Sequence, residues 1–192
     1  MNKREFLAKS AISLGAAAVL LSGCTTTPMS AQPKGPAKEK EINDRVDATL
    51  DRLYSSAPNS RELVNKARGV LVFPSVLAAG FVVGGEYGEG ALRVGGKTVD
   101  YYSTVTGSFG LQIGAQSKAI IFLFMTQEAL DKFVNSEGWT AGVDASVALI
   151  TIGANGMLDL NTATKPVSAI VMTNQGLMAN LSVEGTKVTK LK

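Results

Sequence analysis

Residues 69–90 read GVLVFPSVLAAGFVVGGEYGEG. Short runs of β-branched and aromatic residues alternate here with glycine, which is typical of antiparallel strands rather than of βαβ units. Glycines within such runs indicate strong bending or close backbone approach, so we expect a curled, barrel-like sheet. The same pattern continues to the C-terminus and predicts strands at residues 70–73, 81–87, 91–94, 98–104, 107–115, 120–125, 143–152, 167–172, 177–183 and 187–191.

The segments between these strands carry signals of their own. One helix is predicted from Gln127 to Asn135, entered through Thr126, with Ala129, Leu130 and Phe133 on its buried face. We expect this helix to cover the sheet as a lid or plug. Elsewhere, residues that tolerate positive φ stand where hairpin turns require them: Gly95-Gly96, Asn155-Gly156 and Asn174-Gln175-Gly176.

Two helices are predicted ahead of the strands. The first helix covers residues 39–56, where apolar residues recur at helical spacing: Ile42, Val46, Leu50, Leu53 and Tyr54. The second helix starts at Asn59 as N-cap, with Glu62 as its reciprocal capping partner, and Gly69 ends it. The fold class that we expect is α+β: N-terminal amphipathic helices packed on a curled, barrel-like antiparallel sheet, with one further helix inserted between strands.

The first 24 residues predict export and lipidation. A basic start leads into an apolar run from Ala11 to Leu21, and Leu21-Ser22-Gly23-Cys24 closes it. The run is shorter than the roughly 20 apolar residues of a spanning helix, so residues 1–23 are interpreted as a lipoprotein signal peptide. We expect a covalent lipid on Cys24. Thr25 rather than Asp follows the cysteine, which favours the outer membrane, facing the periplasm of a bacterial cell envelope.

The export route stays open, because Lys3-Arg4 also resembles a variant twin-arginine signal, although an ordinary basic start explains it as well. Residues 24–38 hold almost no large apolar side chain and are predicted to be a flexible tether. Residues 39–192 are predicted to form one domain.

Removal of residues 1–23 takes away Lys3, Arg4, Lys9 and Glu5, and therefore leaves 16 basic and 15 acidic residues. The net charge falls from +3 to +1, so the body has no strong positive charge to attract nucleic acid, and we expect no nucleic-acid partner. Cys24 is the only cysteine, so its acylation leaves no thiol for a disulfide or a thiolate metal site.

Catalysis is not expected, and neither is a cofactor or a metal. The chain has no histidine, which removes Ser-His and Cys-His pairs and the commonest zinc ligands. Ser117 and Lys118 are neighbours in sequence, a commonplace pairing rather than a dyad. Five carboxylates could be imagined as a pair for hydrolysis or a cation site, but their spacing favours neither: Glu86, Glu89, Asp100, Asp144 and Asp159.

Basic residues are concentrated in the tether and the first two helices, close to the predicted lipid. Their placement suits an anionic membrane surface, where each can contribute about 1 kcal/mol to binding. Acidic residues are interleaved with them, so ordinary solvated helix faces stay an alternative interpretation. The residues that we predict to contact lipid headgroups are Arg45, Arg52, Arg61, Lys66 and Arg68.

An ordered series of blocks resembles the SYLF domain, a lipid-binding module, over about residues 60–190. The blocks are KARGV (66–70), VFP (72–74), AGFVVGG (79–85), GSFGLQIGAQ (107–116), the hydrophobic strand and helix of 119–133, and GVDAS (142–146). The resemblance implies a module that binds membrane phospholipids, phosphoinositides in eukaryotic members, through basic residues and an amphipathic N-terminal helix. Lys66 and Arg68 match its basic positions. Some members are described as binding actin, which an exported lipoprotein would not meet.

The function predicted from these observations is a membrane-anchored periplasmic lipoprotein whose domain binds anionic phospholipid without catalysis. One alternative is an envelope scaffold that recruits protein partners by strand addition to exposed glycine-rich strand edges. A further alternative is an envelope hydrolase, which would need an open cleft that brings Glu86, Asp100 or Asp144 together.

Overall fold

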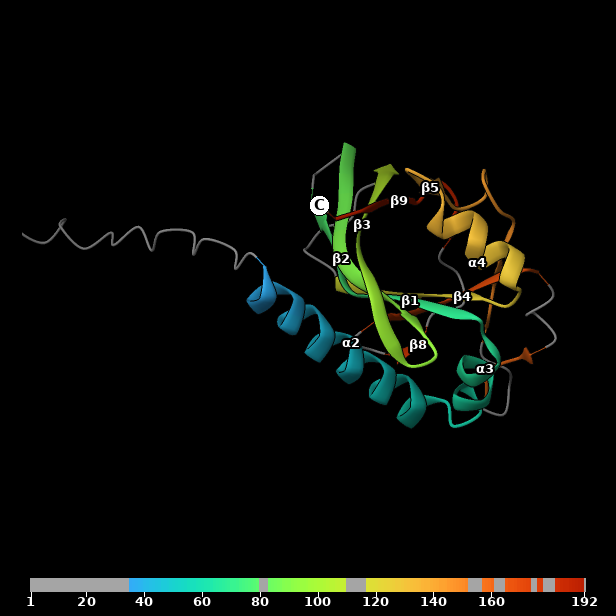
Figure 1. Ribbon diagram of the computed structural model, residues 1–192. Coiled ribbons are helices and arrows are strands. Elements are labelled where there is room, and N and C mark those ends of the chain that lie inside the picture. The colour runs from blue at the N-terminus through green and yellow to red at the C-terminus, as the bar shows by residue number, and fades with distance from the viewer. Residues whose placement is uncertain are drawn as a thin grey trace, which may run out of the picture. The chain divides into compact units, whose positions relative to one another are not determined.

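A curled β-sheet organises the folded part of the chain (Figure 1). The computed structural model describes residues 35–79, 83–109, 117–151, 157–160, 165–173, 176–177 and 182–191. Residues 34–192 form one compact unit, whereas the predicted signal peptide and Cys24 lie outside the described residues. The predicted α+β class is confirmed, because helices pack on a curled sheet and one helix is inserted between strands.

The strands of the described residues form one sheet in the order β5-β9-β3-β2-β1-β4-β7-β6, with β8 paired to β7. Every pair is antiparallel except β6 with β7, which is parallel and departs from the predicted all-antiparallel sheet. The chain between them is long enough for such a crossover. The strands are β1 (Gly69–Ala79), β2 (Val83–Val94), β3 (Lys97–Phe109), β4 (Ser117–Phe124), β5 (Trp139–Thr140), β6 (Val147–Leu149), β7 (Val167–Thr173), β8 (Gly176–Leu177) and β9 (Lys187–Lys190).

The described helices are α2 (Pro36–Ser56), α3 (Ser60–Lys66) and α4 (Gln127–Val134). Helix α2 begins at Pro36 rather than at the predicted Glu39. Proline suits the first turn of a helix because the N–H that it lacks would have no partner there. Helix α3 ends at Lys66, and Gly69 opens β1 instead of closing the helix as predicted.

Both faces of the sheet are covered by helices. Along β4, side chains alternate between two hydrophobic clusters, because successive residues of a strand point to opposite faces. Ile121 and Leu123 pack with α2 and α3, while Phe122 and Phe124 pack with α4. Burial on both faces explains why residues 119–124 form an uninterrupted apolar run, which on its own does not distinguish a strand from a buried helix.

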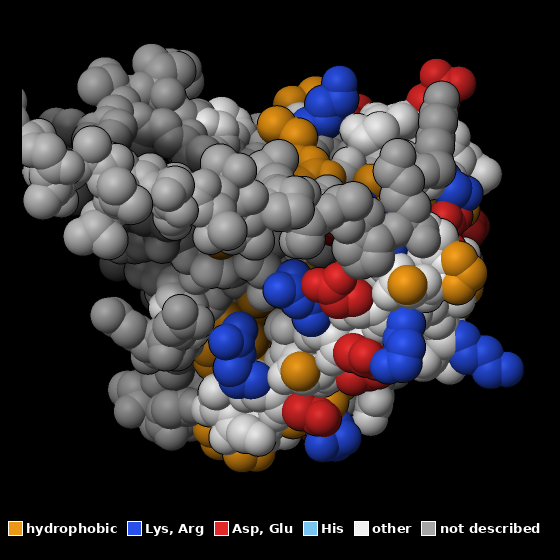
Figure 2. All heavy atoms as spheres, turned by 90° about the vertical axis from the view of Figure 1, so that its left-hand side faces the viewer, with side chains coloured by type: hydrophobic (Ala, Val, Ile, Leu, Met, Phe, Trp, Pro, Cys, Tyr) orange, Lys and Arg blue, Asp and Glu red, His pale blue; other side chains and the backbone are white. Residues whose placement is uncertain are grey.

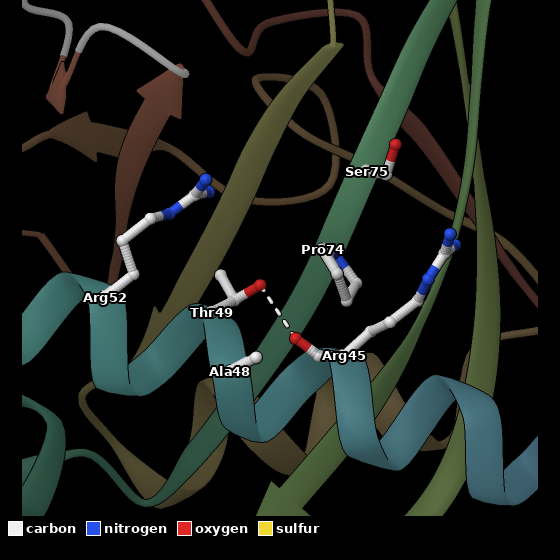
Figure 3. Close-up of a pocket in the computed structure, with 6 residues that line it drawn as sticks. All are labelled: Arg45, Ala48, Thr49, Arg52, Pro74 and Ser75. Atoms are coloured by element: carbon white, nitrogen blue, oxygen red, sulfur yellow. Dashed lines mark hydrogen bonds between the residues drawn. The ribbon is translucent and has the colours of Figure 1, made fainter.

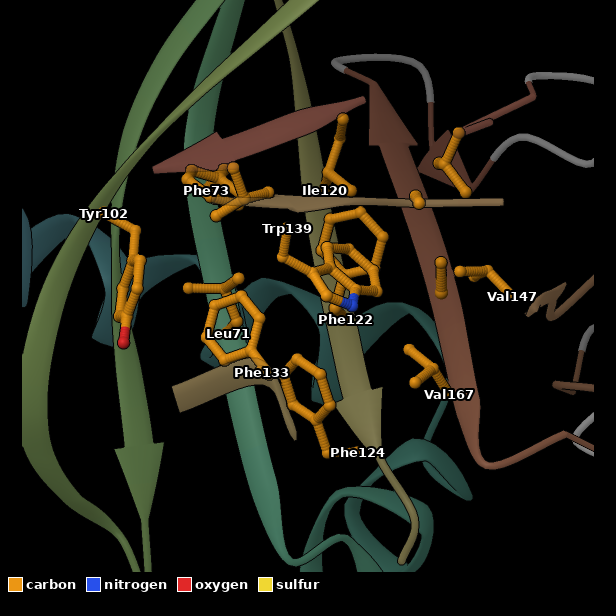
Figure 4. Packing of buried hydrophobic residues seen from close by; sticks show 14 of the residues in the cluster. Leu71, Phe73, Tyr102, Ile120, Phe122, Phe124, Phe133, Trp139, Val147 and Val167 are labelled. Atoms are coloured by element: carbon orange, nitrogen blue, oxygen red, sulfur yellow. The ribbon is translucent and has the colours of Figure 1, made fainter. Parts of the chain in front are cut away.

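The cluster under α4 is rich in aromatic rings (Figure 4). Phe133 of α4 lies 4.7 Å from Phe124 and 5.7 Å from Trp139, measured between ring centroids. Leu130 and Phe133 are buried as predicted, and Thr126 caps the helix by accepting a hydrogen bond from the Ala129 N–H at 3.2 Å. Helix α4 therefore covers this face of the sheet, and Trp139 belongs to the core.

Strand β2 runs unbroken from Val83 to Val94, where two strands, 81–87 and 91–94, were predicted; residues 81 and 82 lie outside the described residues. The prediction was wrong because β2 is paired on both sides, with β1 and β3, so its glycines do not interrupt the ladder. At Gly90 a Cβ atom would lie 2.0 Å from the Val72 carbonyl oxygen, and at Gly88 one would lie 2.8 Å from that of Ser75. These glycines thus permit a close approach to β1, beside a register shift between Val72 and Ser75.

Strand β3 is likewise continuous where 98–104 and 107–115 were predicted separately, and residues 110–116 lie outside the description. The Gly95-Gly96 turn is confirmed, with φ of 58° and 79°, whereas Asn155-Gly156 and the turn beginning at Asn174 involve residues that the structure does not describe. The predicted strand 143–152 is wrong at its start, since Val143 is exposed in a turn and, of the described residues 143–151, only Val147–Leu149 forms a strand.

Asn59 occupies the N-cap position of α3, but its side chain makes no capping hydrogen bond. It pairs instead with the backbone of Leu158: Nδ2 donates to the carbonyl oxygen at 2.9 Å, and Oδ1 accepts from the N–H at 3.1 Å. The predicted partner Glu62 is engaged by Lys66. A long-range contact has therefore replaced the predicted capping box.

Candidate functional site

Helix α2 lies over β1 and β2 through a stripe that includes Ile42, Val46 and Leu53. On both sides of the stripe, polar side chains fix the helix to the sheet. Lys38 Nζ contacts Glu89 Oε1 at 2.6 Å, Asn43 Nδ2 donates to the Tyr101 hydroxyl at 2.7 Å, and Arg93 contacts Asp47 at 2.9 Å. These contacts recur along α2 and set its rotation about its own axis.

The flank of α2 that carries Lys38, opposite Asn43 and Asp47, borders an open groove of about 330 Å³. Arg45 and Arg52 lie seven residues apart, which is close to two helical turns and therefore places both on this flank. Figure 3 shows their side chains rising from α2 toward the sheet on either side of Pro74. We call this feature the arginine groove; its lining residues are Arg45, Ala48, Thr49, Arg52, Pro74 and Ser75.

An irregularity in β1 forms the floor of the arginine groove. The register of β1 shifts against both β2 and β4 around Pro74 and Ser75. Proline has no N–H to give to a ladder and is tolerated in a sheet at such bulges. The Ser75 hydroxyl lies 2.9 Å from that of Ser117 on β4, and the Thr49 hydroxyl donates to the Arg45 carbonyl oxygen at 2.8 Å.

The guanidinium groups of the groove are available to an anion. Arg45 is exposed and lies 3.7 Å from Glu41, a surface pair worth little in water. Within the described residues, the exposed side chain of Arg52 has no hydrogen bond or ion pair. Arginine presents several N–H donors in a planar fork that matches phosphate and carboxylate oxygens. The groove can therefore bind an anionic group at a surface that is open to large ligands.

Arg61, another predicted headgroup ligand, lies elsewhere. Its guanidinium carbon is 4.1 Å from the ring centroid of Tyr54, which belongs to the flank of α2 away from the arginine groove. Burial raises the pKa of Tyr54, and the charge of Arg61 opposes that rise. Tyr54 and Leu50 line a second hollow with Arg93. Arg61 is thus held by a cation–π contact on the other side of the helix.

Lys66 and Arg68, the two positions that match the SYLF blocks, differ in their surroundings. Lys66 Nζ lies 2.7 Å from Glu62 on the exposed surface of α3, and this contact lowers the pKa of the Glu62 carboxyl. The Arg68 side chain is exposed and, among the described residues, makes no ion pair or hydrogen bond. Of the five predicted residues, the structure brings only Arg45 and Arg52 to one groove.

The carboxylates that were considered for catalysis have separate partners. Glu86 pairs with Lys118 at 2.7 Å, Glu89 with Lys38, and Asp100 with Lys190. Asp144 accepts a hydrogen bond from the Thr140 N–H at 2.6 Å. The described residues contain no cluster of three acidic, cysteine or histidine side chains that could hold a metal ion.

The surface drawn in Figure 2 carries basic and acidic side chains side by side, with apolar ones among them. Charge on this face is therefore mixed rather than concentrated in one patch. None of the helices that the structure describes is both long and apolar enough to cross a membrane.

Pro74, Ser75 and Thr49 were not predicted as part of a site. The available signal was Pro74 itself, because a proline inside an apolar strand pattern marks a bulge or an edge. The predicted strand stopped at Phe73, so the bulge and the groove above it were missed. Nothing in the sequence around Thr49 indicated a site. In the structure its hydroxyl bonds within its own helix.

The comparisons with known proteins bear on the second half of the chain. No curated protein matches it. The family described as Ysc84, Las17-binding protein actin regulator, matches from the second half of β3 onward, so α2 and the arginine groove lie outside the match. Part of the predicted SYLF resemblance is thereby confirmed: residues 105–192 are similar to the Ysc84 (SYLF) domain.

Proposed function

We propose that the domain binds anionic phospholipid headgroups in the arginine groove, while a lipid on Cys24 holds the chain at the periplasmic side of a bacterial outer membrane. The observation that carries the proposal is the pair Arg45 and Arg52, which border one open groove and are not neutralised by close, buried partners. The anchoring and the location rest on the signal peptide pattern of residues 1–24.

The chemistry of the groove suits a phosphodiester at a surface. Two arginines near an anionic bilayer can contribute about 1 kcal/mol each. A single acyl-type anchor is commonly reinforced by a second attachment of this kind. The Ser75 hydroxyl at the groove floor adds a short polar group beside the two cations. We therefore assign phosphate recognition to the groove and lasting attachment to the lipid.

The similarity to the Ysc84 domain supports a non-catalytic binding module. That family is described as a Las17-binding protein and actin regulator, and an exported protein would meet neither Las17 nor actin. The scaffold alternative required free edges on glycine-rich strands. Because β2, which contains Gly84 to Gly90, is paired on both sides, the edges of this strand are occupied. Membrane lipid is thus the ligand that we favour.

The test uses residues 25–192, which contain the whole compact unit with both hydrophobic clusters and lack the lipidated cysteine. Sedimentation with vesicles of phosphatidylcholine alone, or with phosphatidylglycerol added, measures binding at low and high salt. We expect binding only with the anionic lipid, and we expect salt to weaken it.

The variant Arg45→Gln/Arg52→Gln is expected to lose most of this binding. A matched control, Lys40→Gln/Lys132→Gln, removes two exposed charges outside the groove and is expected to bind like the parent. Binding that is indifferent to lipid charge would contradict the proposal, as would equal losses in both variants.

A further inference from the structure

Three exposed apolar side chains lie in one row across adjacent strands. Leu77 of β1 is directly opposite Tyr87 of β2, and Tyr87 is directly opposite Val105 of β3. Directly opposed residues in a sheet project from the same face. Each of the three is about half exposed, at 52%, 49% and 52% respectively. We call them the apolar row.

The apolar row lies on the face that α2 covers, beside the first turns of that helix. Tyr87 donates a hydrogen bond from its hydroxyl to Glu89 at 2.8 Å, and the same carboxylate contacts Lys38 of α2. The neighbouring residues Glu86 and Gly88 are buried on the opposite face. The row therefore belongs to the same face of the sheet as α2, in a part that α2 leaves uncovered. We call this face the outer face.

The row continues from the arginine groove. Leu77 follows Ser75 by two residues on β1, so both side chains project from the same face, about 7 Å apart along the strand. Basic side chains stand at its margins: Lys187 of β9 is opposite Val105, and Lys38 lies at Glu89. An apolar strip with a tyrosine and flanking lysines has the composition of a surface that enters the interface of a bilayer.

The chain length between the predicted anchor and α2 limits how far this row can lie from a bilayer. Eleven residues separate Cys24 from Pro36, so the start of α2 lies within about 40 Å of an acylated cysteine even when the chain is fully extended. Helix α2 starts beside the row. The occupant that fits is therefore the membrane to which the chain is attached.

We propose that Leu77, Tyr87 and Val105 insert into the interfacial region of that membrane when the arginine groove engages headgroups. This inference rests on the proposed function and adds the orientation of the bound domain: the outer face of β1–β3 faces the lipid. The insertion is apolar and does not depend on lipid charge. Headgroup contact through Arg45 and Arg52, by contrast, depends on lipid charge.

The experiment places an environment-sensitive fluorophore on single cysteines, which residues 25–192 otherwise lack. The sites are Leu77→Cys and Val105→Cys, with Val99→Cys as the matched control, because Val99 is equally exposed on the same strand but lies outside the row. We expect emission from the first two labels to shift to the blue and to be quenched by nitroxides in the acyl chains of phosphatidylglycerol vesicles, while the Val99 label stays in water.

A second variant, Leu77→Ser/Val105→Ser, is expected to bind vesicles about tenfold more weakly and to keep the salt dependence of the parent. Emission of Trp139 checks that it is folded. If the parent binds vesicles while the labels at Leu77 and Val105 stay in water, the insertion is refuted, the proposed function stands, and the row is left to a protein partner. If the parent does not bind vesicles at all, both proposals fail.

Discussion

Glu86 and Lys118 form a largely buried ion pair that reaches across the strand lying between their own strands. Their side chains, 8% and 14% exposed, meet at 2.7 Å between Oε2 and Nζ. Glu86 lies on β2 and Lys118 on β4, and β1 runs between these strands. The pair therefore spans β1 on the face of the sheet opposite α2.

Removal of one partner is expected to destabilise the protein strongly. Lys118→Met leaves an uncompensated buried carboxylate and should lower the free energy of unfolding by about 3 kcal/mol or more. Glu86→Leu/Lys118→Met should recover most of that loss, because no charge then stays buried. Urea unfolding followed by Trp139 fluorescence measures both. The exposed pair Glu128–Lys132 is the control, and Lys132→Met should leave the midpoint nearly unchanged.

Gly90 is expected to tolerate no side chain. A Cβ atom there would lie 2.0 Å from the carbonyl oxygen of Val72, so Gly90→Ala should lower the free energy of unfolding by about 3 kcal/mol or more. At Gly107, by contrast, nothing lies within 4 Å of such an atom. Gly107→Ala should therefore be close to neutral. Equal midpoints of thermal unfolding for the two variants would contradict the close approach of β1 to β2 at Gly90.

Two tyrosines are expected to ionise late. Burial raises the pKa of Tyr102 to about 12, and burial together with the hydrogen bond to Glu89 raises that of Tyr87 to about 12. Because both folded values lie above the ordinary 10.0, the two groups favour the folded state below about pH 10, and this contribution is lost as the pH rises toward 12.

Absorbance at 295 nm as a function of pH measures these ionisations. We expect part of the tyrosine signal to titrate only near pH 12 or on alkaline unfolding. Tyr102→Phe should remove a share of the late phase and reduce the loss of stability between pH 10 and 12. Its hydroxyl has no hydrogen-bond partner among the described residues, so the variant should stay folded at neutral pH. A single transition near pH 10 in the parent would contradict the raised pKa of both tyrosines.

The parts of the fold that the sequence predicted correctly depend on local chemistry. Gly95 and Gly96 adopt positive φ as the turn demands, and Thr126 caps α4 through its own hydroxyl. The division of β2 into two strands failed because its glycines were taken as interruptions. Their effect depends on β1, whose bulge at Pro74 lies opposite them, and sequence reasoning on β2 alone cannot include that contact.

The charged residues of the candidate site could be predicted from the sequence, but their arrangement around one groove could not. Arg45 and Arg52 were predicted from charge and position, together with Arg61, Lys66 and Arg68. Polar contacts with β2 and β3 fix the rotation of α2, which carries the first two, whereas Arg61 and Lys66 lie on α3 and Arg68 follows it. The apolar row was not predictable, because the alignment of Leu77 with Tyr87 depends on the register shift in β1.

The most direct test of the central claim compares two pairs of charges that were both predicted to bind headgroups. The dissociation constant of residues 25–192 for phosphatidylglycerol vesicles is measured for the parent, Arg45→Gln/Arg52→Gln and Lys66→Gln/Arg68→Gln. Each variant loses two positive charges, so a general electrostatic effect would weaken both equally. The arginine groove predicts a loss of about 30-fold for the first variant, corresponding to about 2 kcal/mol, and binding close to that of the parent for the second. Equal losses, or a loss confined to the second variant, would contradict it.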